Sequence, residues 1–233
     1  MKVSTREAIG DLLNMENSNS IDLIIPRGSG ELVKSIKQKS KMIPVLGHAD
    51  GVCHIFVDQY ANADKAIEII IDSKTDYPAA CNAAETLLFH KECINNGLLD
   101  AVIKRLKSLG VEMYSGPNLA ARLTFGPPVT DNLKYEYGEL ACTVEVVSSL
   151  EDAIRHIHQY GSSHTDVIIT EDKNSMETFL NSVDSACVFA NCSSRMSDGY
   201  RLGLGKDYLS MWILKHQIPI KCCLFYAVTI NYG

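Results

Sequence analysis

The sequence predicts an α/β fold with one mainly parallel sheet. Short apolar runs alternate along the chain with longer segments whose apolar residues recur at helical spacing. Such alternation is typical of strands joined by crossover helices, which keep the strands parallel and cover both faces of the sheet. The chain of 233 residues shows neither an internal repeat nor a low-complexity linker, and it suits one large domain or two small ones.

Helices are predicted where apolar side chains repeat every three or four residues. The first begins at the capping pair Ser4 and Glu7, and a later one begins at Ser149 and Asp152, which are spaced in the same way. The other helices are expected at 32–36, 63–73, 97–109 and 176–180.

Strands are predicted at short apolar runs bounded by turn residues. These runs cover 21–25, 43–46, 52–57, 86–89, 111–114, 142–147, 166–170 and 186–190. In a parallel sheet with right-handed crossovers, the loops that follow the strands meet at one edge, where ligands bind. We therefore expect a ligand site at the carboxyl ends of the strands. Residues 116–132 are expected to be irregular because they hold three prolines.

The composition argues against several classes of protein. The formal net charge is -6 and no run of basic residues offsets it, which disfavours a general nucleic-acid binder. The N-terminus has no apolar signal region, and no apolar stretch approaches the length of a membrane span. The 8 cysteines include no Cys-x-x-Cys pair and no cluster with histidine at zinc spacing. We expect a cytoplasmic protein with reduced thiols, no metal, and neither nucleic acid nor membrane as a partner.

Cys81 is the first candidate for chemistry. It follows Pro78, which cannot continue a preceding helix, so it falls at a junction between a helix and a strand. A thiolate at such a place can reach a cleft and attack an electrophilic carbonyl carbon. The alternative is that Cys81 packs as a small hydrophobic side chain, which is the commoner role of cysteine.

The turn at 26–30 is a second candidate, because it contains Gly28, Ser29 and Gly30 between a predicted strand and a predicted helix. This order can hold a phosphate group, since the backbone N–H groups at the start of the helix face the ligand. The glycine spacing matches neither the full dinucleotide fingerprint nor a P-loop, so a turn without a ligand explains it as well.

Several segments in one order resemble a single enzyme family. They read Ile-Asp-Leu-Ile-Ile-Pro-Arg-Gly-Ser at 21–29, Val-Leu-Gly-His at 45–48, Tyr-Pro-Ala-Ala-Cys-Asn-Ala-Ala-Glu-Thr-Leu-Leu at 77–88, Tyr-Gly-Ser-Ser-His-Thr-Asp at 160–166 and Ser-Arg-Met-Ser-Asp-Gly at 194–199. Over about 4–205 the sequence resembles the γ-glutamyl phosphate reductases (glutamate-5-semialdehyde dehydrogenases), more closely the reductase domain of plant and animal δ-1-pyrroline-5-carboxylate synthases. These enzymes belong to the aldehyde dehydrogenase superfamily.

The resemblance implies an aldehyde dehydrogenase-like fold in three parts. A partial Rossmann-like NADPH domain is expected at 1–76, an α/β catalytic domain at 77–205 and a divergent tail at 206–233. The implied reaction reduces γ-glutamyl phosphate to glutamate-5-semialdehyde in proline biosynthesis, with NADPH as cofactor. Cys81 takes the family's nucleophile position and is expected to form a thioester. Val45 stands where hydrolytic aldehyde dehydrogenases carry a water-activating glutamate, and an apolar residue there suits a reductase.

The resemblance also assigns binding residues. Gly28 and Ser29 are expected near the cofactor pyrophosphate, and Glu136 near the nicotinamide ribose. Activation of Cys81 is expected from its surroundings, such as a helix N-terminus.

Asn191, Ser194 and Arg195 are expected to line the substrate pocket, where a guanidinium suits a carboxylate or a phosphate. A surface salt bridge is the alternative for Arg195. His48 and His164 are explained equally well as hydrogen-bonded loop histidines.

Two departures from the family open other hypotheses. The segments that supply the first Rossmann strands, a cofactor-binding lysine and an oxyanion asparagine have no counterpart here, and the residues from Lys206 onward do not match. Losing one oxyanion donor typically lowers the rate about a hundred-fold or more. The chain is therefore either a reductase or an inactive form that at most associates with full-length subunits, and self-association stays open. A free-standing α/β binding module is the remaining alternative.

Overall fold

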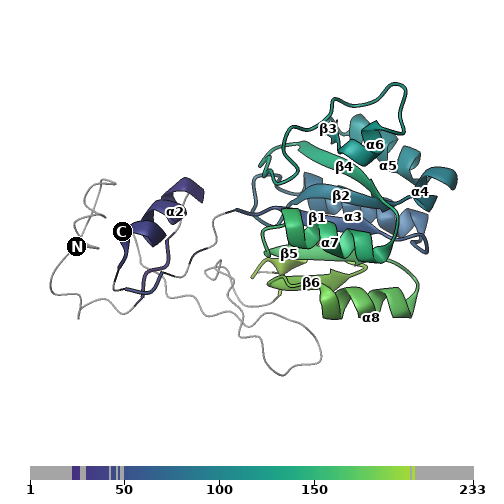
Figure 1. Ribbon diagram of the computed structural model, residues 1–233. Coiled ribbons are helices and arrows are strands. Elements are labelled where there is room, and N and C mark those ends of the chain that lie inside the picture. Colours follow the sequence, from purple (N-terminus) through teal and green to yellow (C-terminus); the bar gives the residue numbers. More distant parts are fainter. Residues whose placement is uncertain are drawn as a thin grey trace.

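The structure is a computed structural model that describes residues 23–26, 30–41, 43–45, 47, 50–199 and 201–202. Within these residues the sheet contains β1 (Cys53–Val57), β2 (Ala84–His90), β3 (Glu112–Ser115), β4 (Ala141–Val147), β5 (Thr165–Ile169) and β6 (Cys187–Ala190). The strand order is β3-β4-β2-β1-β5-β6, and every neighbouring pair is parallel (Figure 1). The prediction of an α/β fold with a mainly parallel sheet is confirmed.

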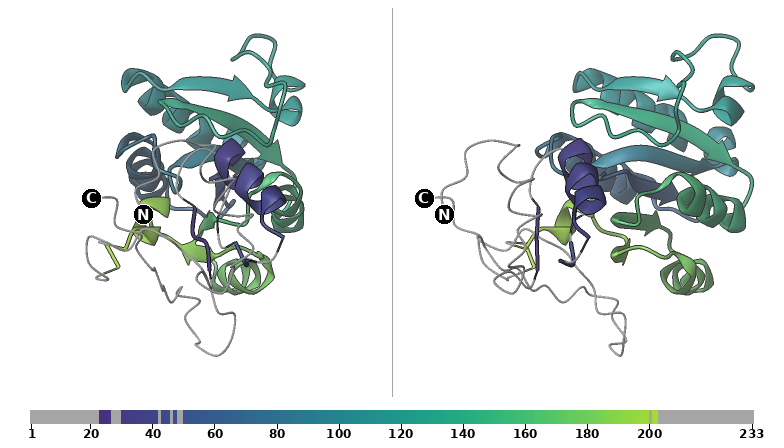
Figure 2. Two further views of the ribbon diagram at one scale, coloured as in Figure 1. Left: turned by 90° about the vertical axis from the view of Figure 1, so that its left-hand side faces the viewer. Right: turned by 60° about the vertical axis from the view of Figure 1, so that its left-hand side comes forward.

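Helices cover both faces of this sheet, as Figures 1 and 2 show. One face packs against α3 (Ala63–Thr75), α4 (Glu92–Asn95) and α5 (Leu98–Ser108), and the other packs against α7 (Leu150–Tyr160) and α8 (Lys173–Ser182). The short helices α6 (Pro117–Ala120) and η2 (Ser194–Ser197) follow β3 and β6. Because both faces are covered, the central strands β1, β2 and β4 are buried along their whole length.

The helix starts follow from local side chains. Asn62 caps α3 by accepting a hydrogen bond from the backbone N–H of Lys65 at 3.1 Å. Ser149 caps α7 by accepting one from the N–H of Asp152 at 3.1 Å, as the sequence predicted. Their apolar residues then face the sheet.

The chain winds the sheet in two directions. From β1 through β2 to β3 it passes along the face covered by α3, α4 and α5. From β4 through β5 to β6 it moves the opposite way along the face covered by α7 and α8. Opposite directions on opposite faces are what right-handed crossovers produce. The connection that follows β2 therefore crosses one face of the sheet, and the connection that follows its neighbour β4 crosses the other face. The same holds for the neighbours β1 and β5.

A smaller unit precedes the sheet and lies to one side of it in Figure 1. It consists of α2 (Gly30–Lys39) and one parallel bridge between Ile24 and Val45, which belong to the first two predicted strands. The Lys34 Nζ lies 3.0 Å from Asp50 Oδ2, near the start of the sheet. β1 and α3, which precede Asp76, pack with the later strands of the sheet. The division into domains at Asp76 stays a prediction.

From residue 50 to residue 199, the predicted helices and strands agree with the structure, with shifts of a few residues at their ends. The predicted strands at 21–25 and 43–46 appear in the described residues only as the bridge between Ile24 and Val45, and the segment 116–132, predicted to be irregular, contains α6. Two four-residue helices, α4 and α6, were not predicted, because four residues are too few to show helical periodicity. The predicted first helix, which starts at Ser4, and the tail at 206–233 lie outside the described residues.

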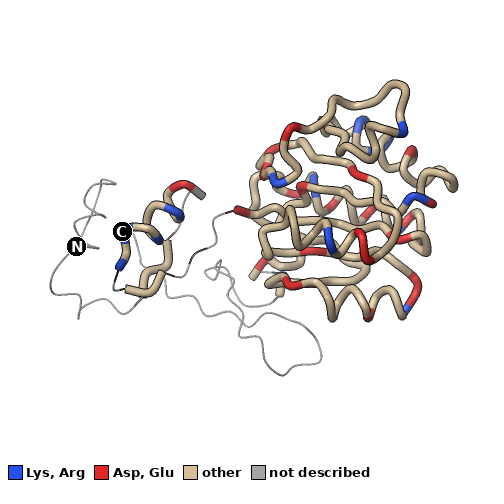
Figure 3. Tube along the Cα trace, viewed as in Figure 1, with Lys and Arg blue, Asp and Glu red and all other residues tan. Residues whose placement is uncertain are grey.

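Charged side chains are distributed over the described trace in Figure 3. Lys34, Lys37 and Lys39 share α2, while acidic and basic residues are interspersed over the sheet and its helices. Among the described residues, no helix combines the length and the apolar character needed to span a bilayer.

Candidate active site

Cys81 lies on the turn between α3 and β2, and it is exposed to solvent. Two backbone hydrogen bonds shape this turn, from Ala80 N to Tyr77 O at 3.1 Å and from Ala83 N to Ala80 O at 2.9 Å. Tyr77 has a φ of 64°, in the left-handed region, which turns the chain away from the end of α3. Cys81 is therefore not a core residue, and its side chain is accessible for chemistry.

The turn lies at the edge of the sheet where the strands begin. Cys81 shortly precedes β2, and all strands are parallel, so its loop is at their amino ends. The sequence led us to expect ligands at the carboxyl ends, which the position of Cys81 does not match. The rule concerns loops that follow strands, whereas the Cys81 turn leads into one.

Two residues at the start of β1 support the carbonyl group of Cys81. The buried Cys53 thiol donates a hydrogen bond to the Cys81 oxygen, with 3.2 Å between Sγ and O. Burial, with a further contribution from Asp166, raises the pKa of Cys53 well above its ordinary value, so this thiol stays protonated and can donate. A Cβ atom on Gly51 would lie 2.2 Å from the same oxygen, so only glycine lets the two backbones approach this closely.

Asn82, the next residue, is fixed by the segment around η2. It is 4% exposed. Its carbonyl oxygen accepts a hydrogen bond from Ser194 Oγ at 2.6 Å, and its side-chain oxygen accepts one from Arg195 Nη1. The backbone N–H of Ser194 in turn donates to Ser73 Oγ of α3 at 3.0 Å. The predicted residues Ser194 and Arg195 are thus brought to the Cys81 turn, where they hold its neighbour.

Arg195 is 7% exposed, which excludes the alternative of an ordinary surface salt bridge. Its Nε lies 3.5 Å from the half-exposed carboxylate of Asp76, at the end of α3. Its guanidinium therefore joins the two ends of the segment that carries Cys81. A direct substrate contact by Arg195 stays a prediction.

A buried ion pair lies beneath the turn. Lys74 Nζ of α3 is 2.9 Å from Glu85 Oε2 of β2, and both side chains are almost fully buried. Burial raises the pKa of Glu85 to about 7, although the Lys74 ammonium opposes this rise. The backbone N–H of Gly138 donates to the other carboxylate oxygen of Glu85 at 3.3 Å. The pair thus fastens α3, β2 and the loop before β4 to one another.

The remaining predicted site residues differ in position. Glu136 is half-buried in the loop before β4. Two residues later, the backbone N–H of Gly138 donates to the Glu85 carboxylate, so Glu136 lies at the same sheet edge as Cys81. Asn191 follows β6 and exchanges hydrogen bonds with the backbone of Thr170, so it lies at the opposite edge. Gly28 and Ser29 lie outside the described residues.

Of the two histidines that the sequence analysis considered, His164 lies in the described part of the chain, in the loop before β5. His164 is buried, with Nδ1 2.9 Å from Thr165 Oγ1 and 3.8 Å from Cys53 Sγ. His48 lies outside the described residues. In the part of the chain that the structure describes, no three His, Cys, Asp or Glu side chains are grouped to hold a metal ion.

Sequence reasoning did not single out four residues of this site. These buried residues are Asn82 within the turn and, packed against it, Cys53, Lys74 and Glu85. A signal for Glu85 exists, since a carboxylate inside the apolar run of β2 must find a partner. The expected helix N-terminus is not the one adjoining the turn, because α3 presents its C-terminal end there.

Comparison with known proteins identifies relatives of the chain. No family model matches the chain. It is 53% identical over 205 residues to δ-1-pyrroline-5-carboxylate synthase B of Arabidopsis thaliana, covering 88% of this chain and 28% of that protein. It is 45% identical over 205 residues to γ-glutamyl phosphate reductase of Acaryochloris marina, covering 88% of this chain and 47% of that protein. The chain is thus similar over 205 residues to γ-glutamyl phosphate reductase and to part of δ-1-pyrroline-5-carboxylate synthase.

Solved structures agree with these relatives in fold. The γ-glutamyl phosphate reductase of Thermotoga maritima matches 100% of this chain and 57% of its own, with a TM-score of 0.84 and 28% identity. An engineered glycolyl-CoA reductase, solved with bound NADP+, matches 89% of this chain and 54% of its own, with a TM-score of 0.64 and 17% identity. The chain thus spans about a quarter to a half of the curated relatives' length and about half of these structures.

Proposed function

We propose that this chain carries the acyl-accepting thiol of a γ-glutamyl phosphate reductase and takes part in the NADPH-dependent reduction of γ-glutamyl phosphate to glutamate-5-semialdehyde in proline biosynthesis. The observation that supports this best is the exposed Cys81 on a turn held by buried contacts, in a chain 45% identical to such a reductase over 205 residues.

The residues of the turn fit a covalent mechanism. The Cys81 thiolate attacks the acyl carbon of γ-glutamyl phosphate, a carbon–sulfur bond forms, and the carbon–oxygen bond to phosphate breaks. The resulting thioester needs a hydride at its carbonyl carbon, which NADPH supplies when bound. The thiohemiacetal then releases the aldehyde and regenerates the Cys81 thiolate. Throughout, hydrogen bonds to the Cys81 and Asn82 carbonyl oxygens hold the backbone that carries the thiol.

We further propose which residues bind the two small molecules. The carboxylate of Glu136, at the edge that carries Cys81, suits the hydroxyl groups of the NADPH ribose, and Gly28 and Ser29 complete the cofactor contact. Arg195 and Ser194 contact Asn82, next to Cys81, and a guanidinium at this position suits the charged groups of the acyl phosphate. Asn191 is less suited to a substrate contact because it lies at the opposite sheet edge.

The reverse reaction tests the activity directly. Glutamate-5-semialdehyde, phosphate and NADP+ are mixed with the full chain, and the formation of NADPH is followed by its absorbance. We expect turnover that Cys81→Ser abolishes and that Cys192→Ser leaves unchanged, since Cys192 is half-buried after β6. If the parent chain shows neither turnover nor thioester formation at Cys81, the reductase proposal is wrong.

The alternative expected from the sequence is that the chain associates with full-length subunits without turning over substrate. Co-expression of a tagged copy with a full-length relative tests this. Retention of the full-length protein on the tag, with no activity in the isolated chain, would favour it; recovery of the tagged chain alone would eliminate it.

A further inference from the structure

The topology contains a ligand-binding position that the Cys81 turn does not use. At their carboxyl ends, β2 sends the chain to α4 and α5 on one face, and its neighbour β4 sends it to α7 on the other. In open α/β sheets, ligands bind outside the carboxyl ends of strands at such a switch point. β4 is 7 residues long, so its end lies roughly 20 Å from the edge that carries Cys81.

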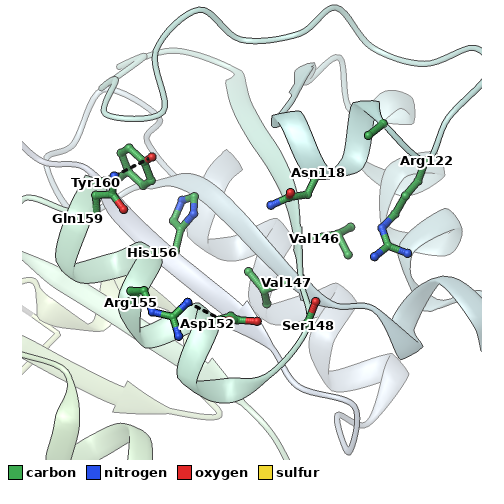
Figure 4. A pocket seen from close by; sticks show the side chains of 11 residues that line it. Asn118, Arg122, Val146, Val147, Ser148, Asp152, Arg155, His156, Gln159 and Tyr160 are labelled. Carbon is green, nitrogen blue, oxygen red and sulfur yellow. Dashed lines mark hydrogen bonds and ion pairs between the residues drawn. The ribbon is translucent and has the colours of Figure 1, made fainter.

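A groove of about 530 Å³ occupies this position, between the segment around α6 and helix α7 (Figure 4). Its floor is the end of β4, at Val147 and Ser148. Asn118 and Arg122 line the side of α6, and His156 and Tyr160 line the side of α7. The volume is within the range of natural small-molecule sites.

His156 is the buried polar group of the groove. It is 9% exposed, and its Nε2 has no hydrogen-bond partner among the residues that the structure describes. Figure 4 shows its imidazole projecting from α7 into the groove. The ring packs 5.5 Å from His54 and 4.7 Å from Tyr160, between ring centroids. Burial, followed by the effect of His54, lowers the pKa of His156 to about 3, so the ring is neutral and Nε2 can accept or donate one hydrogen bond.

The charges of the groove favour an anion. Arg155 Nη1 is 2.7 Å from Asp152 Oδ1, so these two groups neutralise each other. Arg122 is exposed and makes no ion pair within the described part of the chain. The groove therefore offers one available guanidinium at one end and two rings, tilted by 54° to each other, at the other.

We propose that this groove binds a small organic anion that carries a planar ring. Its phosphate or carboxylate faces Arg122 and Asn118, and its ring packs beside His156 and Tyr160, with one hydrogen bond to His156 Nε2. The site is separate from the Cys81 turn, and it stands whether or not the chain is a reductase.

Phenyl phosphate, benzoate and inorganic phosphate test the site on the full chain. Phenyl phosphate carries both features, benzoate exchanges phosphate for carboxylate, and inorganic phosphate lacks the ring. We expect calorimetry to show one-to-one binding of phenyl phosphate that is at least about tenfold tighter than that of inorganic phosphate. The comparison with benzoate decides which anion is preferred. Amide NMR signals of Asn118, Ser148 and His156 should shift, and those of Cys81 and Asn82 should not.

Variants separate the groove from general surface binding. Arg122→Gln should weaken phenyl phosphate binding about tenfold, and His156→Phe should weaken it while keeping a ring in place. Arg105→Gln, on α5 at the other face, should change nothing. An absence of saturable binding at millimolar phenyl phosphate, an equal effect of both arginine variants, or signal shifts confined to Cys81 and Asn82 would overturn the proposal.

Discussion

The Cys53 thiol and the Cys81 carbonyl oxygen are hydrogen-bonded across 3.2 Å, which ties the first strand of the sheet to the turn that carries the proposed nucleophile. Gly51 lies against the same oxygen. Contacts with the start of a buried strand thus fix the backbone that carries the exposed Cys81 side chain.

Gly51→Ala should lower the activity of each folded molecule as well as the stability of the chain. Its new Cβ would lie 2.2 Å from the Cys81 oxygen and 2.8 Å from its Cα, both backbone atoms that move only with the turn. A displacement of about 1 Å at a reacting group can lower the rate about a hundred-fold. The measurement is the semialdehyde oxidation rate beside the urea unfolding free energy.

Gly110→Ala is the matched control for this glycine. Gly110 has open space around it and a φ of 77°, so alanine there costs about 1 kcal/mol of stability through its backbone alone. Its activity per folded molecule should equal that of the parent. Equal losses in the two variants would mean that Gly51 acts on stability and not on the position of Cys81.

Arg195→Gln should destabilise the chain by about 2 kcal/mol, because it removes a buried charged donor from the Asn82 side chain. Asp76→Asn should cost less than about 1 kcal/mol, since that carboxylate is half-exposed. If Arg195 only holds the turn, kcat falls and KM for the acyl substrate is kept. A raised KM with unchanged kcat would instead support a direct substrate contact.

Glu85 should make the chain less stable as the pH rises from about 4.5 to about 7. Its pKa is raised in the folded state, so the unfolded chain loses the proton first, and the folded state loses its advantage until Glu85 also ionises. The free energy of unfolding decreases by about 3 kcal/mol over this range. Above pH 7 Glu85 is ionised in both states, so it causes no further change in stability. Urea unfolding at pH 5 and pH 8 measures it.

Glu85→Gln isolates this carboxyl group from all others. The difference in unfolding free energy between the parent and the variant should be larger at pH 5 than at pH 8. A difference that does not change with pH would show that Glu85 does not titrate in this range. Lys74→Met should raise the pKa of Glu85 further, because the ammonium now favours its charged form.

Asn191→Ala should lower stability by about 2 kcal/mol and leave both kcat and KM unchanged. Asn191 has a φ of 53°, in the left-handed region that alanine disfavours, and it makes two hydrogen bonds to Thr170. Steady-state kinetics measure kcat and KM of the variant, and thermal unfolding measures its stability. A KM that rises for the acyl substrate would restore the role expected from the resemblance.

The sequence predicted the sheet well because its strands are short, apolar and separated by amphipathic helices. The Asn62 and Ser149 caps show how local chemistry sets where α3 and α7 begin. The sequence predicted that Cys81 lies at a junction between a helix and a strand. It did not predict the sheet edge on which Cys81 lies, since that depends on whether its loop leads into a strand or follows one.

The support beneath Cys81 was not predictable from local pattern. Cys53 and Cys81 are 28 residues apart, and Arg195 and Asn82 are 113 residues apart. Only the fold brings these pairs together. The groove at the end of β4 was also missed, because α6 has four residues and leaves no periodic signal.

The central place of β1 has a consequence for how the protein is made. β1 is the first strand of the sheet, yet one of its partners, β5, is encoded about a hundred residues later, as the bond between His54 and Asp166, 112 residues apart, illustrates. At ribosomal speeds of about 5–20 residues per second, one side of β1 waits roughly 5–20 seconds for its neighbour. During that interval the backbone groups on one edge of the apolar β1 are unpaired and can bond to a strand of another nascent chain. We therefore expect chaperone binding to this stretch to reduce aggregation most before β5 is synthesised.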